Sequence, residues 1–391
     1  MHIAWIGKKS PPCGNVTYSR EITNALLDRG YQVSFLHFAQ EEEIEFSGND
    51  RAESYGSLIE CQDVPLPFIY KSQIYTIPSL KSSKVLANAL RDLKPDLVHA
   101  SLTLSPLDFV LPEICEELNV PLVATFHPPF SHKHRNISSG TQQFMYQLYA
   151  PFLANYDAVI IFSEAQRELL HRLGVPLERL VVIPNGVDVN KYSPGLSQFR
   201  QELNADHIFV YQGRMAIEKN VESLLKAWRQ AAMPSTSKLV MMGNGSLLNS
   251  LMQTYGPEHH ILWLGNILDE QRRIDILRGA DVFVLPSFVE GLSLSLLEAM
   301  GCGVACLATD VGADGEVLSG GAGIVLNPQR VQGELLTLLP MFVDQPEFSE
   351  LLGRKARQRV LEKYSLSGNI DHLERFYTHY SQWSKTPTMM N

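Results

Sequence analysis

Residues 283–303 read FVLPSFVEGLSLSLLEAMGCG, an apolar run followed by a loop and a second apolar stretch. Residues 283–285 predict a buried strand, and the proline that follows predicts a turn. The stretch then continues as a helix, with Glu290 in the loop and Glu298 about one turn inside the helix. Open α/β sheets form ligand sites in this way, at the carboxyl ends of their strands. The helix N-terminus adds N–H groups that attract anions.

The chain has 391 residues, of which 45% are hydrophobic, and a formal net charge of −9. This length predicts two domains, and the acidic balance argues against a general nucleic-acid binder, which would usually be basic. The apolar N-terminus is too short for the core of a signal peptide, and no apolar run approaches the ~20 residues that span a bilayer. The cysteines have no metal-ligand or disulfide spacing: Cys13, Cys61, Cys115, Cys302 and Cys306. We therefore expect a cytoplasmic protein whose association with membranes, if any, is peripheral.

Short apolar runs alternate with longer amphipathic segments along most of the chain. Buried strands are predicted in the first half at residues 3–6, 33–38, 97–100, 122–126, 159–162 and 181–183. They are predicted in the second half at residues 208–211, 239–242, 261–264, 282–285, 304–307 and 324–326. Helical segments between them include 18–29, 84–93, 107–118, 142–153, 166–173, 221–232 and 270–277. Strands that alternate with helices predict parallel sheets covered on both faces, and the restart of the pattern predicts two doubly wound domains.

The joint between the two domains falls near residues 184–195, where PNGVDVNKYSPG collects proline, glycine and asparagine. We expect an N-terminal Rossmann-like domain over residues 1–188 and a C-terminal one over residues 189–367. Residues 348–363 and 370–383 predict two consecutive helices with no strand between them. The second of these, within the tail 368–391, has one apolar face and must pack on one of the two domains.

Two loops after strands of the second half contain residues that suit a nucleotide diphosphate. The first, GRMAIEKN at residues 213–220, holds Arg214, a planar fork for phosphate oxygens, and Lys219, a mobile point charge. The second, GNGS at residues 243–246, has glycines that allow a close backbone approach. Solvated charges at a helix start and a plain turn are the alternative interpretations.

Candidate residues in the first half also follow strands. Gly14 and Asn15 stand where a helix begins and could bring N–H groups to a phosphate, although a turn alone would explain them. His127 follows the strand at 122–126, at a carboxyl end where ligand residues gather, although a lone histidine is more often structural. The sequence has no P-loop, no convincing GxGxxG, no His-x-x-x-His pair and no G-x-S-x-G elbow. These absences argue against ATP hydrolysis and nicotinamide chemistry and leave little support for metal or serine-nucleophile chemistry.

Taken together, the motifs resemble glycosyltransferase family 4, the retaining, nucleotide-sugar-dependent enzymes with the two-domain GT-B fold. The most specific match is Glu290–Gly291 followed by LLEAM at residues 296–300, which is similar to the E-x7-E signature of that family. Three further segments match in order and spacing: IPNGVD at 183–188, GRM…EKN at 213–220 and ADVFVLPS at 280–287. The resemblance covers nearly the whole chain. It implies an α/β fold of two Rossmann-like domains facing across a cleft, with the C-terminal helix crossing back to the N-domain.

The resemblance also implies roles for individual side chains. Arg214 and Lys219 would hold the diphosphate of the donor, and Glu298 would accept hydrogen bonds from the ribose hydroxyls. Glu290 would meet the hydroxyls of the transferred sugar, with His127 near the same sugar. No covalent nucleophile is evident in the N-domain, so we expect front-face attack on an ion-pair-like centre, as proposed for the family.

Further donor-binding positions are carried over from the family as loop and backbone sites. They are Gly14, Gly265, Ile267, Leu268, Gly291, Leu292 and Ser293. Gly14 would approach the phosphates, residues 291–293 the sugar and phosphate, and residues 265–268 the base. The sequence departs from the family pattern in PPCGN, where many relatives have two adjacent glycines, and in GCGVAC, which lacks a common proline.

We therefore expect a retaining transferase that moves a hexose from UDP-galactose or UDP-glucose to an acceptor hydroxyl, with no metal or other cofactor. Residues 1–38 also resemble glycolipid glycosyltransferases of photosynthetic membranes, including digalactosyldiacylglycerol-synthase-like enzymes. A galactosyl- or glucosyl-diacylglycerol is therefore one candidate acceptor. Residues 128–149 include the basic SHKHRN and continue into the aromatic FMYQLYAPF at 144–152. This segment could dock on anionic lipid, or could be a solvated loop before a core helix. The alternatives are a soluble or polysaccharide acceptor, a UDP-sugar epimerase of the same fold, and a non-catalytic nucleotide-sugar-binding subunit.

Overall fold

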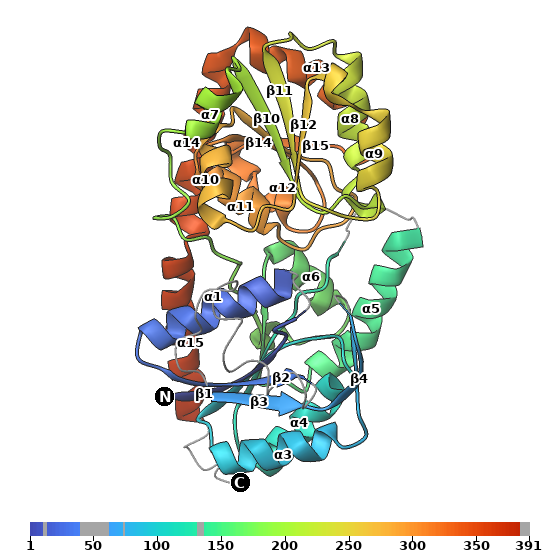
Figure 1. Ribbon diagram of the computed structural model, residues 1–391. Coiled ribbons are helices and arrows are strands. Elements are labelled where there is room, and N and C mark those ends of the chain that lie inside the picture. Colours follow the sequence, from blue (N-terminus) through green and yellow to red (C-terminus); the bar gives the residue numbers. More distant parts are fainter. Residues whose placement is uncertain (11–13, 40–61, 73–74, 131–136, 384–391) are drawn as a thin grey trace, which may run out of the picture. The chain divides into compact units, whose positions relative to one another are not determined.

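The computed structural model of the chain describes residues 1–10, 14–39, 62–72, 75–130 and 137–383. They form two units, each built around its own parallel sheet (Figure 1). The first unit comprises Met1–Pro128, Gln143–Ile183 and Ile370–Asn391, and the second comprises Pro129–Gln142 and Pro184–Asn369.

The sheet of the first unit has seven described strands in the spatial order β3-β2-β1-β6-β7-β8-β9. They are β1 (His2–Gly7), β2 (Gln32–Phe38), β3 (Gln62–Leu66), β6 (Leu97–Ser101), β7 (Leu122–Thr125), β8 (Ala158–Ile161) and β9 (Leu180–Val182). A separate antiparallel hairpin joins β4 (Phe68–Lys71) to β5 (Thr76–Pro78). The six strands predicted for this half are all present. The edge strand β3 and the hairpin were not predicted, because both contain proline and neither is a continuous apolar run.

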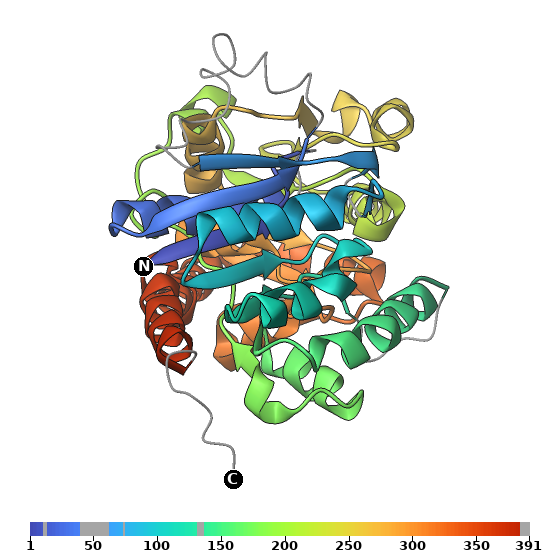
Figure 2. The ribbon, with the colours of Figure 1, turned by 90° about the horizontal axis from the view of Figure 1, so that it is seen from below.

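Helices pack on this sheet between the strands. α1 (Gly14–Asp28) packs on β1 and β2, α3 (Ser82–Leu93) packs on β3, and α4 (Leu107–Glu117) packs on β7. α3 and α4 lie side by side on the sheet (Figure 2). α5 (Ile137–Leu153) precedes β8, and α6 (Glu164–Arg172) precedes and packs on β9.

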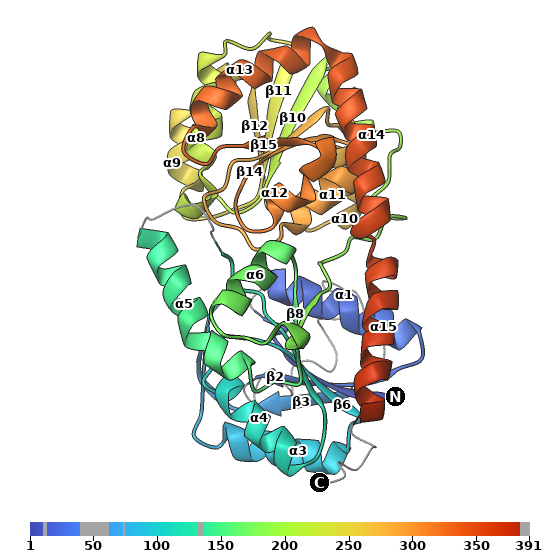
Figure 3. The same cartoon turned by 180° about the vertical axis from the view of Figure 1, so that it is seen from behind.

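The last helix of the chain, α15 (Leu366–Trp383), contributes its residues from Ile370 onward to the first unit. Its apolar face is buried there, with Ile370 and Tyr377 inaccessible to solvent. Arg29, just after α1, forms a salt bridge with Asp371 at 2.6 Å and a second one with Glu374. Figure 3 shows the end of α1 crossing α15 at a steep angle.

The sheet of the second unit has six described strands in the order β12-β11-β10-β13-β14-β15, and every pair is parallel. They are β10 (His207–Gln212), β11 (Ser237–Met242), β12 (Ile261–Gly265), β13 (Val282–Leu285), β14 (Ala305–Thr309) and β15 (Ile324–Leu326). The helices are α7 (Gln198–Leu203), α8 (Val221–Gln230), α9 (Leu248–Thr254), α10 (Glu270–Gly279), α11 (Leu294–Gly301), α12 (Asp314–Val317), α13 (Val331–Asp344) and α14 (Pro346–Lys363). α8, α9 and α13 cover one face, and α7, α10, α11 and α14 cover the other (Figures 1 and 3). α13, which contains Pro340, was not predicted.

Both sheets reverse their strand order at one internal point. In the first unit this point lies between β1 and β6, and in the second it lies between β10 and β13. Loops that leave such a point run in opposite directions, which opens a ligand site at the carboxyl edge. The predicted α/β fold with two Rossmann-like sheets is confirmed, and the loops after β10 and β13 are the place to look for chemistry.

Candidate functional site

Two loops meet at the strand-order reversal of the second unit. The Asn220 side-chain amide, after β10, donates to the Pro286 carbonyl, after β13, at 3.0 Å. The Phe288 N–H donates to the Glu218 carbonyl at 2.8 Å. These bonds tie the loop that carries Lys219 to the loop that carries Glu290.

An ion pair joins the two loops at their centre. The Lys219 ammonium lies 2.6 Å from Glu290 Oε1, and the Ser287 hydroxyl donates to the same oxygen at 2.7 Å. Only 16% of the Lys219 side chain and 9% of the Glu290 side chain are exposed. Removing one partner of such a pair leaves an uncompensated buried charge, which is strongly destabilising. Lys219, predicted to bind phosphate, and Glu290, predicted to bind the sugar, are therefore partners in one largely buried ion pair.

Arg214 belongs to the same loop but lies at its surface. Its side chain is 55% exposed and pairs with Glu218, four residues along the chain, at 2.8 Å. The Tyr211 hydroxyl holds the Arg214 carbonyl at 2.8 Å. Exposed pairs of this kind contribute no more than ~1 kcal/mol. The backbone of Arg214 is thus fixed, while its guanidinium lies at the surface of the loop.

Glu298 lies at the fifth position of α11, just over one turn inside the helix, as predicted. The Gln212 side-chain amide, at the end of β10, donates to Glu298 Oε2 at 2.7 Å. Burial raises the pKa of Glu298 to about 7, and Arg273, Gln212 and Tyr192 counteract this rise. A carboxylate there can accept hydrogen bonds from hydroxyl groups of a ligand.

Glycines allow three loops at this edge to stack closely. Gly243, after β11, has φ +131°, and a Cβ there would lie 1.9 Å from the Gly213 carbonyl oxygen. Its N–H donates to the Gly265 carbonyl at 2.7 Å. The next loop is fixed by Arg273, whose Nη1 donates to the carbonyls of Ile267 and Leu268, each at 3.1 Å. The GNGS glycine Gly243 therefore has a packing role, and the side chain of Leu268 remains 78% exposed.

The loop after β14 forms hydrogen bonds with the start of α11. Asp314 Oδ1 accepts the Ser293 N–H at 3.0 Å, and the Ala313 N–H donates to the Gly291 carbonyl at 2.7 Å. Leu292 and Ser293 are each only 8% exposed. The Ser293 N–H, predicted from the resemblance as a donor to the ligand, is thus engaged by an aspartate in this structure.

In the first unit, His127 follows β7 and belongs to a partly buried polar chain. Its Nε2 lies 2.8 Å from the Ser101 hydroxyl, which donates to Asn15 Oδ1 at 2.9 Å. Burial, with a smaller contribution from Lys8, lowers the pKa of His127 to about 3. His127 is therefore neutral near pH 7 and acts as a hydrogen-bonding group. Gly14 begins α1 and is exposed, and a Cβ added there would meet no atom within 4 Å.

Two protein-family models match consecutive parts of the chain. Glycosyltransferase Family 4 matches residues 13–191, and Glycosyl transferases group 1 matches residues 197–359. The chain belongs to the family 4 glycosyltransferases of the GT-B fold.

Individual relatives of this glycosyltransferase act on different sugars. It is 26% identical over 283 residues to glycogen synthase of Mycobacterium tuberculosis, covering 70% of this chain and 66% of that protein. It is 23% identical over 318 residues to UDP-Gal:alpha-D-GlcNAc-diphosphoundecaprenol alpha-1,3-galactosyltransferase of Escherichia coli, covering 78% and 80%. The structure of Anabaena Alr3699/HepE in complex with UDP-glucose superposes with a TM-score of 0.75 at 17% identity, covering 97% of this chain and 100% of that one. The chain spans about two thirds of the length of the glycogen synthase.

The glycosyltransferase site contains polar partners that the sequence did not identify. Gln212 holds Glu298, Ser287 holds Glu290 and Asp314 holds Ser293. Gln212 ends a strand, and Ser287 and Asp314 follow strands. This position in the sequence is the signal that could have identified them. The roles of the predicted residues toward a ligand remain predictions.

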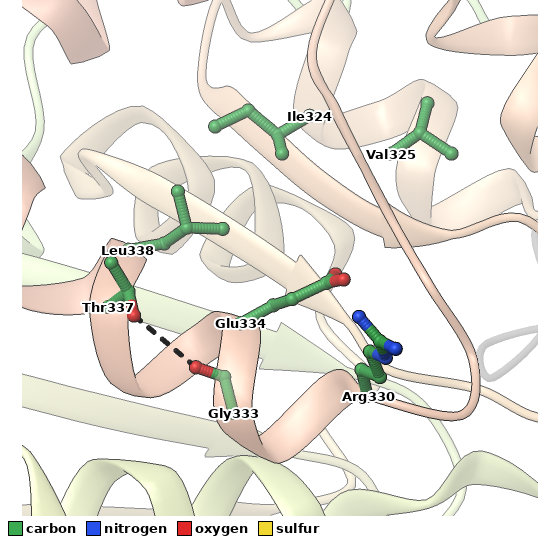
Figure 4. Close-up of a pocket in the computed structure, with 7 residues that line it drawn as sticks. All are labelled: Ile324, Val325, Arg330, Gly333, Glu334, Thr337 and Leu338. Carbon is green, nitrogen blue, oxygen red and sulfur yellow. Dashed lines mark hydrogen bonds between the residues drawn. The ribbon is translucent and has the colours of Figure 1, made fainter.

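A separate surface pocket lies between β15 and α13 and shares no residue with this site (Figure 4). Its lining is Ile324, Val325, Arg330, Gly333, Glu334, Thr337 and Leu338. Glu334, which reaches toward Arg330 in the figure, already accepts the Asn327 N–H at 2.8 Å. We assign this pocket no part in the site.

Two further predictions concern membranes and metals. Within the described ranges, every helix is too short or too polar to cross a bilayer. Over the same ranges, no cluster of three or more His, Cys, Asp or Glu side chains that could hold a metal ion is found.

In the predicted lipid-docking segment, the basic part at 131–136 lies outside the described residues. On α5, Tyr146 and Tyr149 are buried, while Phe144 and Leu148 are 63% and 40% exposed.

Proposed function

We propose that this glycosyltransferase moves a hexose from UDP-galactose or UDP-glucose to an acceptor hydroxyl, with retention of the anomeric configuration and without a metal. The observation that carries the proposal is the Lys219–Glu290 ion pair at the strand-order reversal, with Glu298 on the helix that follows. One loop cluster thereby offers a cation for a diphosphate, an acid for sugar hydroxyls and an acid for a ribose. The E. coli relative named for UDP-Gal and the Anabaena structure with UDP-glucose support UDP as the nucleotide.

The difficult step in such a transfer is the departure of the diphosphate. As the bond between the sugar and the diphosphate breaks, negative charge grows on the leaving oxygen, and Lys219 and Arg214 would stabilise it. Lys219 would shift from Glu290 to the phosphate, which frees Glu290 Oε1 to accept from the sugar hydroxyls. Front-face attack, in which the acceptor arrives on the side that the diphosphate leaves, is carried over from the family and accounts for retention.

Incubation with labelled UDP-glucose or UDP-galactose and a lipid extract, followed by product separation, tests this proposal. We expect UDP release, a glycosylated lipid with an α-linked sugar, and full activity in EDTA. A β-linked product would overturn retention, and loss of activity in EDTA would overturn the metal-free step. Transfer to a soluble glycan alone would replace the lipid acceptor, and an interconverted UDP-sugar without transfer would indicate an epimerase.

We also propose that the acceptor lies in an anionic membrane surface, which the β4–β5 hairpin contacts. Large apolar side chains are exposed on or beside this hairpin: Ile69 (68%), Tyr70 (48%), Tyr75 (44%), Ile77 (40%) and Leu80 (99%). The exposed Lys81 and Lys84 follow directly. Each lysine near an anionic surface contributes about 1 kcal/mol, and tyrosines favour the membrane interface.

The position of the hairpin supports the same proposal. Lys71 donates to the Phe38 carbonyl at the end of β2, and Lys8, after β1, donates to the Ser72 carbonyl at 3.3 Å. These bonds hold the hairpin at the carboxyl edge of the first unit's sheet, where α/β folds receive their ligands.

Cosedimentation with phosphatidylglycerol and phosphatidylcholine vesicles tests the membrane proposal. We expect salt-sensitive binding to the anionic vesicles that is lost in an Ile69→Ser/Ile77→Ser variant. The matched control is Leu196→Ser, because Leu196 is 96% exposed in the second unit. Equal binding by the hairpin variant, or self-association that this variant abolishes, would contradict the membrane as occupant.

A further inference from the structure

Asp314, at the start of α12, is an acid that no motif singled out. Its side chain is inaccessible to solvent. One carboxyl oxygen, Oδ1, accepts the Ser293 N–H, while the buried Oδ2 has no hydrogen-bond partner. Among the described residues, no salt bridge involves Asp314. A buried ionised carboxylate with an empty oxygen would be strongly disfavoured, so the neutral acid is the form that suits this position.

The surroundings of Asp314 decide its charge. The ionisable groups that face it are Glu290 from the loop after β13, Lys219 from the loop after β10, and Tyr364 after α14. Lys219, the cation among them, is already paired with Glu290 at 2.6 Å. Burial, and then the charge of Glu290, raise the pKa of Asp314 well above its ordinary value.

The loop that carries Asp314 packs closely on the loop after β13. At Gly312, with φ +57°, a Cβ would lie 2.3 Å from the carbonyl oxygens of both Glu290 and Gly291. The Ala313 N–H donates to the Gly291 carbonyl at 2.7 Å. Asp314 is therefore held against the loop that presents Glu290, and any change in its charge is felt there directly.

We propose that Asp314 is a positioning residue that works as a neutral acid: it anchors the Glu290 loop through the Ser293 N–H while leaving the Lys219 ammonium to Glu290 and to the donor diphosphate. Loss of its proton would place a second anion beside Glu290. That anion would compete for Lys219 and repel the diphosphate. The expected effect of Asp314 on turnover rests on the proposed function. The neutral state of its carboxyl group rests on the geometry alone.

Two substitutions separate the anchor from the charge. Asp314→Asn keeps an oxygen for the Ser293 N–H and cannot ionise, whereas Asp314→Ala removes the anchor. Asp344→Asn, which neutralises an exposed aspartate at the end of α13, is the matched control. In the wild type and the control, kcat/KM for the UDP-sugar should fall about tenfold per pH unit beyond the pKa of Asp314. In Asp314→Asn this alkaline fall should be absent, whatever the level of its kcat/KM near neutral pH.

Binding and spectroscopy supply readouts that do not depend on turnover. Asp314→Ala should bind UDP as the wild type does but UDP-glucose more weakly, because Ser293 and Glu290 lose their anchor. At pH 7 the infrared carbonyl band of protonated carboxylic acid should be stronger in the wild type than in Asp314→Asn by one group, because Glu298, with a pKa of about 7, contributes to this band in both proteins. An unchanged alkaline fall in Asp314→Asn, or an identical infrared band in both proteins, would overturn the inference. If the wild type turns over no UDP-sugar, the proposed function fails, and the infrared comparison still decides the state of Asp314.

Discussion

Replacement of Glu298 by glutamine should make the protein more stable and a poorer binder of UDP. Burial raises the pKa of Glu298 from 4.5 to about 7. At 1.36 kcal/mol per pH unit, this difference disfavours the ionised form in the folded protein by about 3 kcal/mol. Because Glu298 keeps part of its surface accessible, this figure is an upper bound.

The pH dependence follows from the direction of the shift. Below pH 4.5 the carboxyl is protonated in both the folded and the unfolded chain, so it has no net effect on stability. As the pH rises from 4.5 to about 7, the unfolded chain ionises first and the wild type loses stability. Glu298→Gln avoids this loss, so its advantage should be small near pH 5 and should reach up to about 3 kcal/mol at pH 8.

Urea unfolding of the wild type and Glu298→Gln at pH 5 and pH 8 measures the effect on stability. Glu350→Gln is the matched control, since Glu350 is 73% exposed and should change stability little at either pH. Calorimetric titration with UDP measures the cost to function. Loss of hydrogen bonds to a charged group, each contributing about 1.5–3 kcal/mol, should weaken UDP binding roughly 10- to 100-fold. A stability gap that is the same at both pH values, or a less stable variant at pH 8, would refute the reasoning.

Three further predictions concern the same chain. Arg214→Ala should lower turnover on the order of 100-fold or more without loss of stability. Lys219→Ala should lower both turnover and stability, because Glu290 then stays buried without its cation. Wild-type turnover in both variants would contradict the assignment of these residues to the diphosphate. Gly243→Ala should lower the free energy of unfolding, because the new Cβ would meet the Gly213 carbonyl. Gly333→Ala, at an open position of a helix, should raise the free energy of unfolding by about 0.5–1 kcal/mol. Equal effects of the two substitutions in urea unfolding would contradict this prediction. Burial lowers the pKa of His99 from 6.5 to about 3, so the unfolded chain takes up a proton first and the folded protein should lose stability as the pH drops through 6.5. A variant with His99→Asn should therefore lose less stability than the wild type between pH 7 and pH 4.

The sequence predicted the strands well because parallel strands buried on both faces are continuous apolar runs. Residues 282–285 and 208–211 are examples, and the structure places them in β13 and β10. Elements that break this pattern were missed. β3 contains Pro65 and lies at a sheet edge, and α13 contains Pro340, so their signals were weak.

The site was predictable to the extent that loops after strands carry its residues. The proximity of Lys219 and Glu290, 71 residues apart, could be expected because β10 and β13 are neighbours in this kind of fold. The support of Ser293 by Asp314, 21 residues on, could not, because a short polar residue in a glycine-containing loop gives no sign of its partner. Burial sets the protonation of Glu298 and His127, and burial is a property of the folded chain.

The contribution of α15 to the first unit bears on how the protein is made. Tyr377 contacts His99, which stacks on Trp5 at the centre of the first sheet, with ring centroids 4.1 Å apart. A ribosome synthesises every residue of the second unit before it reaches Tyr377. Domains usually fold in order of synthesis, N-terminal first. Here the first unit gains one of its packed helices only after the second unit has been synthesised, so we expect the second unit to complete its core first and the nascent first unit to expose the apolar surface that α15 covers.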